Sequence, residues 1–280
     1  MALTEREEGI WEEIMDWEQS LVEYEGNDFQ YTYAKWLQAA FEAIPDETLA
    51  TFFGQLDNAL FQVHSLLQGS QFQNEARERI LTSARVFNEE IKTISDMKKL
   101  TLDQLAYLNR QQASRHRLYS LIQGGMTGTG GAVPVSTDFL GMILINLRAV
   151  QLTAMSYGYD PQTPFEMMAS LKVFHAATLP DRLKAAGWQE LLLEFEAQEQ
   201  SFFYEETGRL TDLTWIEGPI KQLFKLLAIN AFKHKKVSNW PLLSVAIGAG
   251  VNYRLTKTVT TYAEKYYQYR LLQEKKADSE

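Results

Sequence analysis

The chain has 280 residues, 45% hydrophobic and 22% charged, so it can bury a sizeable core and has the balance of an ordinary soluble globular protein. It contains no cysteine, which excludes disulfides, thiolate metal sites and cysteine nucleophiles. No apolar signal segment opens the chain, and its longest apolar run is well short of the roughly 20 residues that span a bilayer. We therefore expect a cytoplasmic protein without a transmembrane helix.

Charge is divided unevenly between the two ends of the chain. Residues 1–30 hold ten acidic side chains and one basic side chain, whereas residues 221–276 hold eleven basic and two acidic ones. Charge runs usually form solvated faces, and we favour that interpretation, with the two ends near each other in the fold. The alternative is a basic surface that faces anionic lipid or an acidic partner.

Helical periodicity dominates the first hundred residues, and the alternation typical of strands is nearly absent. The pattern predicts helices over residues 4–24, 29–43, 46–67 and 74–94. Residues 1–100 are therefore expected to form an N-terminal helical region.

The rest of the chain is predicted to be helical as well. Thr101 and Gln104 have the spacing of a capping box, which opens a helix to about residue 122. Further helices are expected over 136–157, 163–178, 180–206, 211–235 and 241–273, followed by a frayed tail over 274–280. Residues 101–273 should form a glycine-rich helical core continuous with the N-terminal region. The predicted fold is all-α, with about ten helices in one compact domain.

Four glycines in apolar segments have a spacing that lets helices approach closely. Gly124 and Gly128 are four residues apart, and Gly248 and Gly250 each follow another small residue by four positions. Glycine costs about 1 kcal/mol relative to alanine inside a helix, so its repeated use indicates a structural role. The stretch around Gly124 lacks the Gly-Lys-Ser/Thr ending of a phosphate-binding loop. We therefore expect close-packed central helices here, not a nucleotide site.

Isolated polar side chains in apolar segments are the candidate catalytic residues: Asp138, Arg148, Glu166 and His175. A buried charge is costly unless it is paired, so Arg148 is predicted to lie against a carboxylate, with Asp138 and Glu166 as the leading candidates. Glu166, His175 and Arg254 are the candidate partners for Asp138 and Arg148. We favour a structural ion-pair network, with a polar site in the helical core as the alternative.

The four histidines lack the spacing of a metal site, and we expect neither a metal nor another cofactor. His116 lies between two arginines and is interpreted as part of a solvated patch, whereas His175 is interpreted as a satisfied core residue. Tyr262, Tyr266 and Tyr269 recur on one face of the last helix. Such a stripe is typical of core packing, with a partner groove as the alternative.

Three segments, taken together, resemble the EcsC protein family. They are the glycine stretch Gly124–Gly131 with Pro134 and Asp138, the run from Leu147 and Arg148 to Tyr157–Asp160, and the tail from Pro241 through Gly248–Tyr253. In the family, this tail continues into a helix with basic and aromatic residues that ends near an arginine, here Arg270. The order and spacing of the segments extend the resemblance over most of the chain, from about residue 18 to 272.

The resemblance implies an accessory or interaction protein at the inner membrane surface, because the family's namesake is encoded beside an ABC transporter linked to secretion. The expected partner is a membrane protein or an anionic lipid surface, not a nucleic acid. The candidate residues for membrane or partner binding are Lys233, Lys235, Lys236 and Trp240. The alternative function is a hydrolase that uses the polar cluster in the helical core. Some family members have been labelled as protease-like, but this chain shows no protease motif.

Overall fold

The computed structural model describes residues 3–24, 71–127, 135–179, 181–200 and 241–277. These residues form seven α-helices and two 3-10 helices, without a strand among them, so the all-α prediction is confirmed for this part of the chain. The predicted helices over 29–43, 46–67 and 211–235 lie outside it. The helices are α1 Glu5–Val22, α4 Gln71–Arg85, α5 Leu102–Thr127, α6 Val135–Ser156, α7 Pro164–Thr178, α8 Lys184–Gln200 and α10 Pro241–Ala277, with η1 Ser95–Lys99 and η2 Asp181–Leu183.

Local capping explains where α1 and α5 begin. Thr4 precedes α1, where its hydroxyl oxygen accepts from the backbone N–H of Glu7 and its own N–H donates to the Glu7 carboxylate. The same reciprocal pair opens α5, between Thr101 and Gln104, as the spacing predicted. Each box satisfies backbone N–H groups that would otherwise lack partners at a helix start.

The prediction of one helix over residues 74–94 is wrong at its C-terminal end. The helix α4 ends at Arg85, and a turn leads to η1. Asp96 explains the turn, because one of its carboxylate oxygens accepts from the backbone N–H groups of Lys92 and Thr93. The Arg85 guanidinium also donates to the carbonyl oxygen of Ile91. These side-chain bonds compete with helical ones, which hydrophobic periodicity alone does not register.

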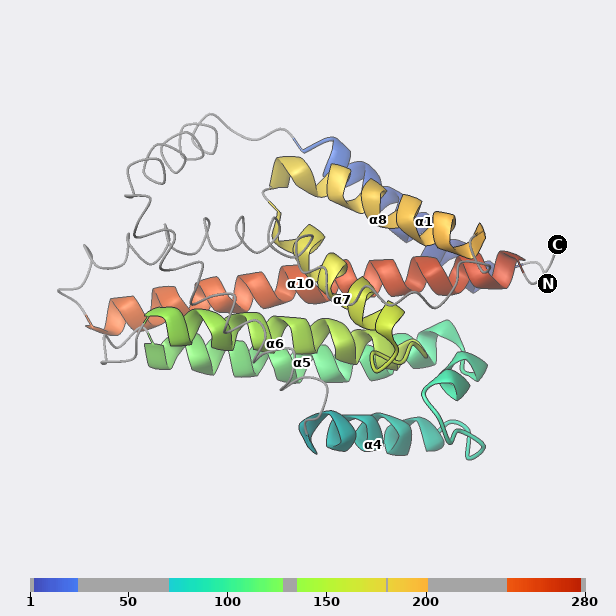
Figure 1. Cartoon of the computed structure of the whole chain (residues 1–280), viewed down its shortest axis with the longest axis horizontal. Helices are drawn as coiled ribbons and strands as arrows, with labels where there is room; N and C mark the ends of the chain where they lie inside the picture. The colour runs from blue at the N-terminus through green and yellow to red at the C-terminus, as the bar shows by residue number, and fades with distance from the viewer. Residues whose placement is uncertain (1–2, 25–70, 128–134, 180, 201–240, 278–280) are drawn as a thin grey trace.

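The centre of the molecule is built on α10, a helix of 37 residues that is about 55 Å long. It packs against α5, α6 and α7, and Figure 1 shows α5 and α6 running along its length. The helices α5 and α10 are antiparallel: Arg117 donates to Thr260, while Arg110, two turns earlier in α5, lies near Glu264, one turn later in α10.

A glycine ends α6 and turns the chain toward α7. Gly158 has a φ of +88°, the backbone N–H of Tyr159 donates to the carbonyl oxygen of Ala154, and that of Gly158 donates to that of Met155. This pattern is a Schellman motif, which requires a left-handed residue at the Gly158 position. The predicted turn at 158–161 is therefore confirmed. It places Tyr159 back against the core, where it is 4% exposed.

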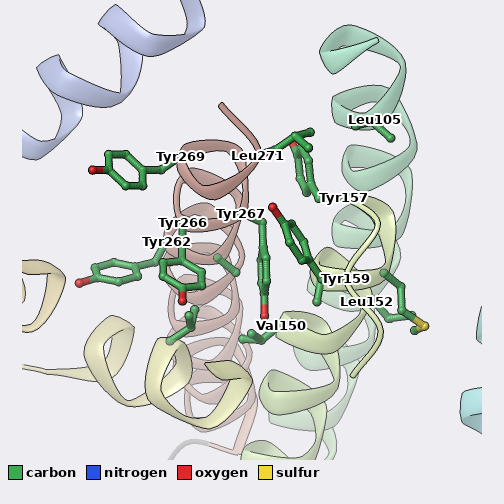
Figure 2. Close-up of a cluster of buried hydrophobic side chains, with 14 of the residues drawn as sticks. Leu105, Val150, Leu152, Tyr157, Tyr159, Tyr262, Tyr266, Tyr267, Tyr269 and Leu271 are labelled. Carbon is green, nitrogen blue, oxygen red and sulfur yellow. The ribbon is translucent and has the colours of Figure 1, made fainter. Parts of the chain in front are cut away.

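On the other side of α10 lie α1 and α8 (Figure 1), joined to it by aromatic packing. Trp188 of α8 is completely buried and packs edge-to-face on Tyr262 and on Trp17 of α1. Tyr266 and Tyr269 also contact Trp188 and are almost fully buried. The tyrosine stripe of the last helix is therefore a core element (Figure 2), as its default interpretation predicted.

The expected frayed tail is corrected for its first residues, because α10 continues through Ala277. Glu274 forms an ion pair with Lys98, and Lys275 forms one with Glu7. The ammonium of Lys276 lies 3.2 Å from the centroid of the Trp11 ring. Contacts from two separate parts of the chain, α1 and η1, therefore hold the last turn of α10 in place.

Candidate functional site

Among the candidate catalytic residues whose side chains the structure describes, Glu166 is the most buried, and it forms an ion pair with Arg270. Glu166 lies in the first turn of α7, where its backbone N–H donates to the hydroxyl of the capping residue Thr163. The two terminal nitrogens of Arg270 donate to the two carboxylate oxygens of Glu166, at 2.8 and 2.9 Å. The side chains are 8% and 4% exposed. This bidentate geometry is the strongest form of an ion pair between these residue types.

Aromatic rings surround this pair. The guanidinium carbon of Arg270 lies 4.1 Å from the centroid of the Tyr159 ring and 5.0 to 5.7 Å from those of Phe195, Phe165, Tyr266 and Tyr267. Figure 2 shows Tyr159 beside Tyr267 of α10, and the centroids of these two rings are 5.3 Å apart. Arginine is attracted to the faces of such rings, and the rings remove water from around the charges.

The chemistry of the Glu166–Arg270 pair is that of a closed structural site. Burial is the largest single influence on the pKa of Arg270 and lowers it, but the hydrogen bonds to Glu166 and the charges of neighbouring groups together outweigh burial and hold that pKa above its ordinary value. An arginine in this state cannot serve as a proton donor at neutral pH. Both Glu166 oxygens are already occupied as acceptors. Glu166 is therefore an ion-pair residue, with Arg270 as its partner.

The other candidate catalytic residues do not gather around Glu166. The predicted pairing of Arg148 with Glu166 is wrong, because Arg270 occupies the carboxylate. Arg148 is half-buried on α6, where burial and then the charge of Arg79 on α4 lower its pKa. Asp138 lies in the first turn of α6, but its side chain lies outside the described set, so an Arg148–Asp138 pair stays a prediction.

The two remaining members of the predicted polar network also lie apart. His175 is half-buried near the C-terminal end of α7, and burial lowers its pKa. Arg254 is exposed on α10. Within the described residues, the proposed catalytic set is therefore dispersed over several environments instead of converging on one site.

The interpretation of His116 as part of a solvated patch is wrong. Its side chain is 9% exposed, its ring packs edge-to-face on Tyr119, and its Nδ1 makes no hydrogen bond to a described residue. Burial, and then the charges of Arg148 and Arg79, lower the pKa of His116 to about 4. The two arginines that flank His116 in sequence point elsewhere, since successive helical residues differ in direction by about 100°.

The acidic start and the basic end of the chain meet, as the favoured interpretation of their charges predicted. Glu7 pairs with Lys275, and Lys265 donates to the backbone carbonyl oxygen of Glu13 at 3.3 Å. The exposed side chains of α1 include further acids, among them Glu5, Glu8, Glu12 and Asp16. The candidate binding residues Lys233, Lys235, Lys236 and Trp240 lie outside the described residues.

The candidate structural glycines are tested at one position only. A Cβ added at Gly250 would meet no described atom within 4 Å, which does not support a close-packing role there. Gly128 and the surroundings of Gly124 and Gly248 lie outside the described set. The crowded glycines are two others: a Cβ at Gly158 would lie 2.6 Å from Lys98 Cγ, and one at Gly187 would lie 2.6 Å from Leu179 Cδ1.

Sequence reasoning did not identify the Arg270 cluster as a site. Arg270 entered only as the arginine near the end of the family's tail segment. The available signal was its spacing, because Tyr262, Tyr266 and Arg270 are each four residues apart and share one helix face. A charge that continues a buried aromatic stripe predicts a buried ionic partner.

The chain is similar in sequence to known proteins. The sequence profile of the EcsC protein family matches residues 8–272. The Uncharacterized protein YdbA of Bacillus subtilis (strain 168) is similar to this chain, with 21% identity over 236 residues that cover 81% of this chain and 80% of that protein. No solved structure matches. In the described segments, no helix is both long and apolar enough to cross a membrane. Because the profile covers nearly the whole sequence, the chain belongs to the EcsC protein family.

Proposed function

We propose that this EcsC-family chain is a non-catalytic interaction protein that binds the inner face of the cytoplasmic membrane and assists a transport system there. It binds anionic lipid reversibly through basic side chains, without a membrane-spanning segment. Its partner is a membrane protein of the transport or secretion machinery.

The observation that carries the non-catalytic half of this proposal is the closed Glu166–Arg270 pair. A general acid or base must reach a substrate and exchange a proton with it. Glu166 is almost fully buried, and both of its oxygens accept from Arg270. The remaining candidate side chains that the structure describes do not supply a second acid or base beside it. The polar groups of the core therefore act in holding α7 against α10.

The membrane half rests on the uneven charge of the chain and on the family resemblance. Residues 221–276 carry eleven basic and two acidic side chains. Each lysine or arginine close to an anionic bilayer contributes about 1 kcal/mol to binding. Lys233, Lys235 and Lys236 form the densest cluster, beside Phe232 and Trp240, which is a pattern suited to the lipid interface.

Vesicle co-sedimentation tests the lipid half. Wild-type protein should sediment with vesicles that contain an anionic lipid and not with neutral ones, and raised salt should release it, because surface charges are screened within about 8 Å at physiological ionic strength. The Lys233/Lys235/Lys236→Ala variant should bind more weakly. A matched variant, Arg79/Lys92/Lys99→Ala, removes three cations elsewhere and should bind like wild type. Equal recovery with neutral and anionic vesicles would refute lipid binding.

Crosslinking and pull-down from native membranes test the partner half. The expected result is recovery of a membrane protein of a transport system, lost at high salt. Hydrolysis of a general ester or peptide substrate that Glu166→Gln abolishes, without loss of folding, would instead refute the non-catalytic proposal.

A further inference from the structure

The exposed side chains of the C-terminal half of α5 and of α10 that the structure describes include cations and aromatic rings and no exposed acid. On α5 the exposed residues include Arg115, Leu118 and Tyr119, and on α10 they include Tyr253, Arg254 and Lys257. Leu118 and Tyr119 are each 55% exposed, and Tyr253 is 39% exposed. These six residues are named the cationic–aromatic face here.

The register of the two helices places these residues side by side. The guanidinium of Arg117 donates to the hydroxyl of Thr260 at 2.8 and 3.0 Å, which joins the helices at one level. Leu118 adjoins Arg117 in α5, and Lys257 precedes Thr260 by one turn of α10. Because the helices are antiparallel, the C-terminal half of α5 lies along the N-terminal half of α10, and their outward residues form one surface.

Acidic groups near this face are paired or withdrawn from solvent. Asp103, at the start of α5, forms an ion pair with Arg6 at 2.9 Å. Glu264 lies in the seam between the helices, where burial raises its pKa against the opposing charges of Arg110 and Arg117. Among the described side chains of α5 beyond Asp103 and of α10, no acidic residue is classed as exposed.

Exposed acidic side chains lie elsewhere. Those of α1 include Glu5, Glu8, Glu12, Glu13 and Asp16, and those of α4 and the turn after it include Glu75, Glu78, Glu89 and Glu90. Figure 1 shows α1 and α8 on one side of α10 and α5 on the other. A negatively charged surface would therefore repel α1 and attract the cationic–aromatic face, which would fix the orientation of the bound protein.

We infer that the cationic–aromatic face of α5 and α10 is the surface that lies on an anionic phospholipid bilayer. This inference rests on the proposed function and adds the orientation of the protein on the membrane. Arg115, Arg254 and Lys257 meet the lipid phosphates, and Tyr119 and Tyr253 lie at headgroup level, where amphipathic rings are favoured. Leu118 supplies apolar contact at the acyl boundary.

The chain has no cysteine, so one introduced thiol is a unique labelling site. Ser114 and Ser20 form a matched pair: each is exposed on a helix and donates to a backbone carbonyl oxygen of the preceding turn. Ser114 lies one turn from Leu118 on α5, and Ser20 lies on α1. A polarity-sensitive fluorophore on Ser114→Cys should shift to the blue when anionic vesicles are added, while the same label on Ser20→Cys should not.

A charge-matched comparison completes the test. Arg254→Gln/Lys257→Gln should lower the partition coefficient for anionic vesicles about 30-fold, from about 1 kcal/mol for each cation. Lys92→Gln/Lys99→Gln makes the same change in net charge away from the face. This variant should change the partition coefficient less than about threefold. Thermal melts confirm that each variant is folded.

The outcomes separate this inference from the proposed function. Vesicle binding with a shift at Ser20→Cys and not at Ser114→Cys would overturn the inference and leave the proposed lipid binding intact. The same holds if the two charge variants bind equally well. Failure of the wild type to bind anionic vesicles would refute the proposed lipid binding, and the inferred orientation with it. If Arg254→Gln/Lys257→Gln no longer captures a membrane protein but still binds vesicles like wild type, the face binds a protein partner and the inference is overturned.

Discussion

At the scale of single residues, the Glu166–Arg270 pair joins α7 to α10 through two charge-assisted hydrogen bonds in an aromatic surrounding. Removing one member leaves a buried charge without its partner, whereas removing both leaves an apolar site. Arg270→Met alone should therefore cost about 3–5 kcal/mol of stability, and the Glu166→Met/Arg270→Met double variant should cost less than the sum of the single variants. Urea unfolding of all four proteins measures this coupling. Strictly additive costs would contradict a paired site.

His116 makes stability depend on pH. Its pKa in the folded protein is about 4, against an ordinary value of 6.5, so between these values the unfolded chain binds a proton that the folded protein does not. Stability is therefore fully present above about pH 6.5 and falls as the pH drops toward 4, by about 3 kcal/mol in total. In His116→Phe, the loss between pH 7 and pH 4.5 should shrink by about 2 kcal/mol.

Chemical unfolding of both proteins at the two pH values checks this expectation. His175 also has a pKa lowered by burial, so the His116→Phe variant should retain part of the acid sensitivity. His175→Phe is the matched control on another helix. Parallel pH profiles for wild type and His116→Phe would contradict the role assigned to the buried imidazole.

At the scale of elements, substitution of two glycines by alanine is expected to change stability in opposite directions. One glycine is required by the backbone conformation at its position, and the other is not. Gly158 has φ +88° and no room for a Cβ, whereas a Cβ added at Gly250, inside α10, would meet no described atom within 4 Å. Gly158→Ala should cost about 1–2 kcal/mol or more, because an L-residue there meets both left-handed strain and Lys98. Gly250→Ala should stabilise by up to about 1 kcal/mol through helix propensity. Thermal melts of the two variants measure the change in Tm. Equal changes in Tm would contradict the different roles of the two glycines.

At the scale of the whole molecule, the last turn of α10 joins the two ends of the chain. Truncation after Gln273 removes the Lys98–Glu274 and Glu7–Lys275 pairs and the contact of Lys276 with Trp11. We expect a loss of about 1–2 kcal/mol, seen as a fall of several degrees in Tm. Truncation after Ala277 keeps all three contacts and should leave Tm within error of wild type. An equal Tm for both truncated proteins would show that these contacts are not stabilising.

Helix positions were largely predictable, because periodicity and caps are local signals. The beginnings of α1, α5 and α7 follow from Thr4, Thr101 and Thr163, whose hydroxyls accept from the backbone of the next turn. Helix ends were less predictable. The chain between α4 and η1 is held by the side chains of Asn88 and Asp96, which accept from nearby backbone N–H groups, and the late end of α10 depends on partners more than 170 residues away.

The amino-acid sequence by itself determined the all-α class, the aromatic stripe of α10 as a core element and the proximity of the oppositely charged ends. These properties follow from composition and helical spacing. Only the tertiary structure decided that Glu166 pairs with Arg270 instead of Arg148, that His116 is buried, and that Gly158 and Gly187 are crowded glycines. The physical reason is that burial and charge pairing depend on which helix faces meet. Residues 104 positions apart in the chain become neighbours only when α7 packs on α10.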